Sequence, residues 1–203
     1  MNMQTFVPSG TISTKIYNYG YYPLLKGDTV PLFHFNREAF VSVQHYLDLQ
    51  QPLVIAFYDG RKNNVSSLSA LARLQSQVLE NGGNLIVITN NNTRLFRKNL
   101  SQLNNLPVFI DADNEIAEKF GLFDVENPLS NWLSGIDDVN AGIPALYVVS
   151  PDRKIVYHHI DYQFNFFGKE ILSKTIVDSL LDAVSTLATS YGYLSRWSKQ
   201  LVS

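Results

Sequence analysis

The side chains that could carry chemistry in this 203-residue chain include four histidines and no cysteine. The absence of cysteine excludes disulfides, thiolate metal sites and every mechanism that uses a thiol. None of the histidines, His34, His45, His158 and His159, falls in a catalytic motif such as Gly-x-Ser-x-Gly. His158 and His159 are adjacent, and successive strand residues point to opposite faces, so the two cannot chelate one metal ion. We expect one to point inward and the other outward.

Two further ligand-binding motifs are incomplete or missing. Residues 111–115 open like a calcium-binding loop, but the sixth position is Ile116 instead of glycine and the twelfth is Leu122 instead of glutamate. No glycine-rich phosphate-binding motif occurs anywhere in the sequence. The sequence therefore predicts no metal site, no nucleotide site and no cofactor.

Composition limits the class of protein further. Sixteen Lys and Arg residues against 18 Asp and Glu give a net charge of −2, and the isoelectric point is about 6.1. A nucleic-acid-binding protein needs many basic groups to neutralise phosphates, so we expect no nucleic-acid partner. No long apolar run and no secretory signal is present, which predicts a cytoplasmic protein without membrane contact. The hydrophobic fraction of 45% favours one folded domain with a sizeable core.

Hydrophobic periodicity predicts alternating strands and helices. A first strand over 30–35 precedes a helix that Asn36 could cap, with Phe40, Val43 and Leu47 on its apolar face. The run at 53–58 is apolar throughout, as expected of a central strand buried on both faces. The remaining predicted strands are 85–89, 107–110, 145–149 and 155–160, and the remaining helices are 66–80, 93–103, 114–120 and one that begins near 171. Because parallel strands need helical crossovers, this order predicts an α/β sheet covered on both faces.

Three segments resemble the alkyl hydroperoxide reductase and thiol-specific antioxidant group of peroxiredoxins. Residues 26–33, KGDTVPLF, are similar to the opening Gly-Asp-x-x-Pro-x-Phe of that group, and residues 54–60, VIAFYDG, are similar to the strand that leads to its active-site loop. Residues 143–157, IPALYVVSPDRKIVY, resemble its proline-led hairpin. The resemblance implies a thioredoxin-like α/β fold, with a central mixed β-sheet flanked by helices. It also implies an N-terminal extension over 1–26, a domain over 27–189 and a C-terminal tail over 190–203.

The chain differs from the family at the positions where family members carry their catalytic cysteines. The positions that match the family's cysteines are Asn63 and Ser66, so the resemblance implies no catalytic residue. An amide is not a nucleophile, and a serine hydroxyl forms neither a sulfenic acid nor a disulfide. Helix capping is the expected role of Asn63, Asn64 and Ser66. In thioredoxin-like folds the proline before the hairpin is usually cis, so Pro144 is expected to follow a cis bond.

The resemblance implies a cleft in place of the thiol centre, and we expect it to bind a small anion or a peptide. The cleft residues predicted in this way are Asp59, Gly60, Asn63, Asn64, Ser66, Trp132, Ile143 and Pro144. Trp132 belongs to an irregular excursion over 122–142 at one rim of the sheet. The predicted function is that of a binding or interaction module, a pseudoenzyme of the peroxiredoxin type.

Two alternatives remain open at this point. One is an enzyme of the antioxidant or oxidoreductase kind that works without cysteine, either through Ser66 and a histidine or with thiols from a partner protein. The other is a homodimer or a complex with a protein partner, in which aromatic residues near the two chain ends form the contact.

Overall fold

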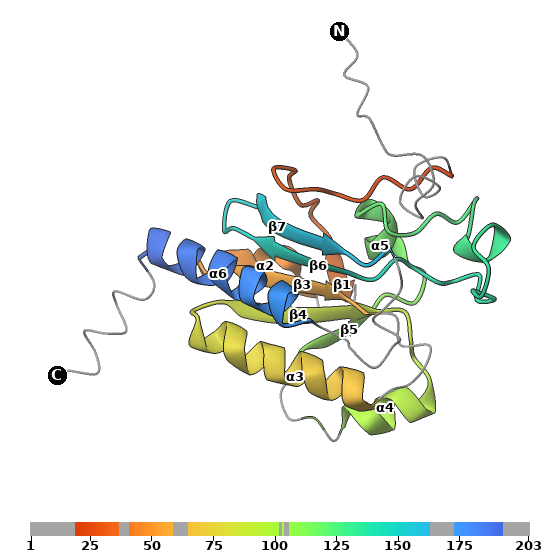
Figure 1. Cartoon of the computed structure of the whole chain (residues 1–203), viewed down its shortest axis with the longest axis horizontal. Helices are drawn as coiled ribbons and strands as arrows, with labels where there is room; N and C mark the ends of the chain where they lie inside the picture. Colours follow the sequence, from red (N-terminus) through yellow and green to blue (C-terminus); the bar gives the residue numbers. More distant parts are fainter. Residues whose placement is uncertain are drawn as a thin grey trace, which may run out of the picture.

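The computed structural model describes residues 19–36, 41–58, 65–101, 103, 106–162 and 173–192. A five-stranded mixed sheet forms its centre, with the strand order β5-β4-β3-β6-β7 (Figure 1). Its strands are β3 (Leu53–Phe57), β4 (Asn84–Thr89), β5 (Val108–Ile110), β6 (Ala145–Val149) and β7 (Ile155–Ile160). Strands β3, β4 and β5 are parallel, whereas β6 is antiparallel to β3 and β7 is antiparallel to β6. The predicted mixed α/β sheet is confirmed.

The central strands consist of apolar residues throughout because both of their faces are buried. All five residues of β3 and all five of β6 are buried, because helices cover both faces of the sheet. The helices α3 (Val65–Glu80), α4 (Arg94–Leu100) and α6 (Lys174–Ser190) pack on one face, and α2 (Val43–Leu47) and α5 (Glu115–Lys119) pack on the other. The prediction of a central strand at 53–58 is therefore confirmed.

Two of the longer helices begin at polar caps. The Thr93 hydroxyl accepts a hydrogen bond from the Phe96 amide at 3.2 Å, and α4 follows it directly. The Ser173 hydroxyl accepts from the Ile176 amide at 3.4 Å at the start of α6. Each cap satisfies one of the amide donors that a helix start leaves unpaired. No helix in the described part of the chain is long and apolar enough to cross a membrane.

The first predicted strand and helix differ from what the structure contains. Instead of capping a helix, Asn36 ends the short strand β1 (His34–Asn36), which pairs with β2 (Val41–Ser42). The helix α2 begins only after Ser42. The reason is tertiary packing, since Phe35 is buried and its ring stacks on Phe109 of β5 with 4.0 Å between centroids. This contact holds the segment extended and overrides the local capping preference of asparagine.

The segment over residues 19–30 lies along the edge of the sheet. Its backbone pairs with the start of β7, where the Gly27 amide donates to the Ile155 carbonyl at 2.8 Å and the Ile155 amide donates to the Asp28 carbonyl at 3.0 Å. The Lys26 amide donates to Nδ1 of His158 at 3.0 Å. Exposed strand edges invite unwanted pairing, and this segment covers part of one. The boundaries of the predicted extension, domain and tail stay predictions, and residues 1–18 and 193–203 lie outside the described residues.

Gly121 follows α5 and lies against the backbone of Tyr22 in the segment over residues 19–30. Its substitution tests this contact between the segment and the end of α5. Gly121 has φ +67°, and an added Cβ would lie 2.1 Å from the carbonyl oxygen of Tyr22. We expect Gly121→Ala to lower the free energy of unfolding by about 3 kcal/mol, because backbone strain and a backbone clash combine. Gly135→Ala is the matched control, since Gly135 has φ +86° and open space around it. In urea denaturation the control should lose only about 1 kcal/mol of unfolding free energy. Equal losses in the two variants would contradict the close contact between Gly121 and Tyr22.

Candidate functional site

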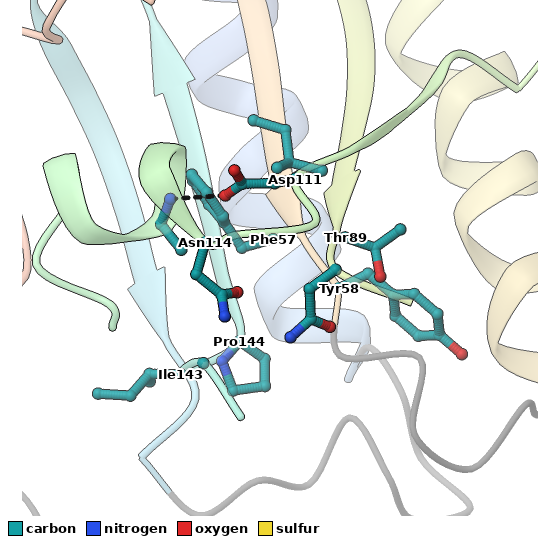
Figure 2. A pocket seen from close by; sticks show the side chains of 11 residues that line it. Phe57, Tyr58, Thr89, Asp111, Asn114, Ile143 and Pro144 are labelled. Carbon is teal, nitrogen blue, oxygen red and sulfur yellow. Dashed lines mark hydrogen bonds between the residues drawn. The ribbon is translucent and has the colours of Figure 1, made fainter. Parts of the chain in front are cut away.

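An open pocket lies where β3, β4 and β5 end beside the loop that leads into β6 (Figure 2). Ligands of open α/β sheets bind at the carboxyl ends of parallel strands, so this is the expected place for a site. The pocket encloses about 310 Å³ of space when its mouth is included. It is lined by Phe57, Tyr58, Ile88, Thr89, Asn90, Asp111, Asn114, Ala117, Gly142, Ile143 and Pro144.

The carboxylate of Asp111 organises one wall of the pocket. It follows β5 directly and accepts hydrogen bonds from the amides of Ile116 at 3.1 Å and Ala117 at 2.9 Å, at the start of α5. Asp111 is only 7% exposed, and its burial raises the pKa of the carboxyl above the usual range. The two amide bonds act in the opposite direction, because they favour the ionised form. The neighbouring charges of Glu115 and Asp113 raise the pKa further.

Asn114 forms the adjoining part of the wall. Its backbone has φ +57°, a left-handed conformation that asparagine tolerates better than most residues. The side chain is 4% exposed, and its Nδ2 donates to the carbonyl oxygen of Asn140 at 3.2 Å. The side-chain amide of Asn90 donates to the same carbonyl. The excursion over 122–142 is thereby tied to the end of β4 and to the start of α5.

Thr89 completes the polar lining at the end of β4. It is 3% exposed, and its hydroxyl accepts a hydrogen bond from the Asn91 amide at 3.1 Å. In Figure 2, Asp111 lies above Pro144 and Thr89 lies to the right of both. Among the described residues that line the pocket there is one ionisable carboxylate, that of Asp111, and no lysine, arginine or histidine. The lining therefore supplies mainly hydrogen-bond acceptors and a negative charge.

The predicted cleft residues are only partly brought together. Ile143 and Pro144 line the pocket. Trp132 does not, because its ring stacks on Tyr19 with 4.6 Å between centroids and its Nε1 donates to the Asn127 carbonyl at 3.3 Å. Among the other predicted positions, Ser66 belongs to the first turn of α3, and the rest lie outside the described residues: Asp59, Gly60, Asn63 and Asn64.

The expected cis bond before Pro144 is wrong, because the described residues contain no cis peptide bond. The backbone on both sides of this trans bond is held by neighbouring segments. The Ile143 amide donates to the Leu122 carbonyl at 2.8 Å, and the Pro144 carbonyl accepts from the Asp161 amide at 2.9 Å. These bonds hold residues 143 and 144 in line with β6.

The histidines do not contribute to the pocket lining. His158 and His159 are both half-buried on β7, and burial lowers the pKa of each imidazole. His34 and His45 are exposed. Within the described ranges, no three His, Asp or Glu side chains are grouped so that they could hold a metal ion.

Sequence reasoning missed Thr89, Asn90, Asp111 and Asn114 as site residues. The available signal was their position, since each follows or ends a predicted parallel strand or begins the next helix. Polar residues at such strand ends meet at one edge of the sheet. Their convergence depends on the order of the strands, which the sequence pattern alone does not fix.

The strand order, the helices on both faces and the pocket beside Pro144 define a protein of thioredoxin-like fold. Similar solved structures include the peroxidoxin BcpB of Mycobacterium tuberculosis, with a TM-score of 0.58, 18% identity and coverage of 80% of this chain and 97% of that one. AhpC of the same organism has a TM-score of 0.56 and 11% identity, with coverage of 83% and 96%. A cysteine-to-serine mutant of PrxQ from Xylella fastidiosa has a TM-score of 0.56 and 13% identity, with coverage of 83% and 99%.

At these low sequence identities, the structural similarity establishes the fold and indicates no activity. Residues 26–158 match the AhpC/TSA family, and this range is more than half of the chain. The chain therefore belongs to the AhpC/TSA family, and it does so without a single cysteine. A search of curated protein sequences finds no significant match.

The contribution of Asp111 to the site can be measured by its removal. We expect Asp111→Ala to lower the free energy of unfolding by about 2 kcal/mol, because two buried amides at the start of α5 lose a charged acceptor. Asp113→Ala is the matched control, since Asp113 is an exposed carboxylate on the same turn. Urea denaturation should show a change within about 0.5 kcal/mol for the control. A loss for Asp111→Ala no larger than that of the control would contradict the capping role.

Proposed function

We propose that this chain is a cysteine-free member of the AhpC/TSA family that binds a ligand or partner at the pocket and has no thiol redox activity. The observation that carries the proposal is the composition, since none of the 203 residues is a cysteine. Peroxide reduction and dithiol exchange in this family require a thiolate, and neither serine nor asparagine replaces it. The pseudoenzyme assignment follows from this chemistry.

The pocket supports the binding half of the proposal. Its wall contains buried polar side chains, Thr89, Asp111 and Asn114, beside the apolar surfaces of Phe57 and Ile143. A concave site with a few converging polar groups in a largely apolar lining is typical of small-molecule binding sites. A cytoplasmic location, a homodimer and a protein partner stay predictions from the sequence.

A cysteine-free enzyme finds less support in the described residues. A serine nucleophile at Ser66 would need a histidine within hydrogen-bond reach. His158 accepts a hydrogen bond from the backbone of Lys26, and neither it nor another histidine lines the pocket. We therefore place the binding role first.

Consumption of hydrogen peroxide with dithiothreitol as the reductant tests the absence of thiol chemistry. We expect the wild-type chain to consume peroxide no faster than buffer, because it carries no thiol. The variant with Asn63→Cys and Ser66→Cys should consume peroxide, because it restores thiols at the family positions near the start of α3.

The matched control carries Ser76→Cys and Asn81→Cys, which place two thiols at the other end of α3. This control should consume peroxide only as fast as ordinary exposed cysteine thiols do. Peroxide turnover by the wild-type chain would overturn the proposal and direct the search to another active centre.

A further inference from the structure

Asn114 carries an unused hydrogen-bond acceptor into the pocket. Its side chain is 4% exposed and its Nδ2 is bound to the Asn140 carbonyl, which fixes the orientation of the amide. Within the described part of the chain, Oδ1 of this amide has no hydrogen-bond donor. Oδ1 is not one of the fully buried unpaired atoms of the described residues, so water or a molecule bound in the pocket can reach it. In Figure 2 this amide lies between Asp111 and Pro144.

Two further acceptors lie beside it. The Asn90 side-chain amide donates to the same Asn140 carbonyl, which leaves its Oδ1 available, and this side chain is half-buried. The Asp111 carboxylate receives backbone amides and has no cationic partner among the described residues. Thr89 adds a hydroxyl whose oxygen already accepts from the Asn91 amide. Among the described lining residues, the one charged group is therefore an acceptor, and the side-chain oxygens of Asn90 and Asn114 add two neutral acceptors.

Such a lining is complementary to a ligand that brings donors and positive charge. A primary ammonium carries three donors, one positive charge and no acceptor. Its hydrogen bonds to amide and carboxylate oxygens are charge-assisted, which makes them stronger than bonds between neutral groups. The pocket is open and of modest size, so a compact head group with a short apolar chain fits it better than a bulky one.

We propose that the pocket binds a small primary ammonium group, whose N–H donors are received by Asn114, Asn90 and Asp111. This inference rests on the proposed binding function and assigns its ligand class. It favours a cation over the small anion that the sequence suggested. An anion would need donors. Among the described residues that line the pocket none is cationic, and the amides of Ile116 and Ala117 are already bound to Asp111, which leaves only neutral donors such as the Thr89 hydroxyl.

A titration of the full chain followed by ¹H–¹⁵N NMR tests the inference. The probe is propylammonium chloride at constant ionic strength. Tetramethylammonium has the same charge without N–H donors, and propionate has a similar size with the opposite charge. We expect saturable shifts of the Asn90 and Asn114 side-chain amides with propylammonium, and no saturable shift with either comparison ion.

Variants link the binding to the named acceptors. Asn114→Gly keeps a residue that accepts φ +57° and removes the free oxygen, and it should raise the dissociation constant for propylammonium about tenfold. Asn90→Ala, at a half-buried position, should raise it about threefold. Asn81→Gly, beyond the far end of α3, is the matched control and should leave the constant unchanged.

The outcomes separate this inference from the function on which it rests. Saturable propylammonium binding that weakens in both pocket variants supports the ammonium site. Equal shifts with tetramethylammonium, or no saturable shift with propylammonium, would overturn it. Saturable binding of propionate at the pocket would also overturn the cationic class, while ligand binding at the pocket would stand. The absence of thiol activity is decided separately by peroxide consumption.

Discussion

The buried carboxylate of Asp111 is the interaction on which the site depends. It stands at the end of β5 and holds the first amides of α5, which fixes this short helix against the edge of the sheet. Asn114, which directly precedes this helix, is thereby placed in the wall of the pocket, and Phe120, which directly follows it, accepts the Leu24 amide at its carbonyl at 3.0 Å. One charged group therefore connects the sheet, the pocket and the N-terminal segment, although burial opposes its ionisation.

The fold does not depend on the thiol chemistry of its family. Its core consists of the fully buried strands β3 and β6, with apolar side chains from helices on both faces. Burial of this kind is the dominant stabilising contribution to folding, and it requires no cysteine. Family membership and the absence of the family's nucleophile are therefore physically compatible. The polar edge where the parallel strands end forms an open pocket among the described residues.

Much of the sheet was predictable from the sequence, whereas the site was predictable only in part. The run at 53–58 has the signature of a doubly buried strand, and helices lie close to the predicted ranges 66–80 and 93–103. Asn36 misled the prediction because the stacking of Phe35 on Phe109 joins segments far apart in sequence. Ile143 and Pro144 were found through the family motif. Asn114 was missed because its role requires a left-handed backbone and a contact with Asn140.

The central claim is that the chain keeps an open, acceptor-rich pocket at the place where the sheet's parallel strands end. A crystal structure of the chain grown with propylammonium tests it most directly. We predict one ammonium nitrogen in the pocket at about 2.8 Å from Oδ1 of Asn114. A pocket filled by side chains of the chain itself, or an ammonium bound only outside it, would contradict the account.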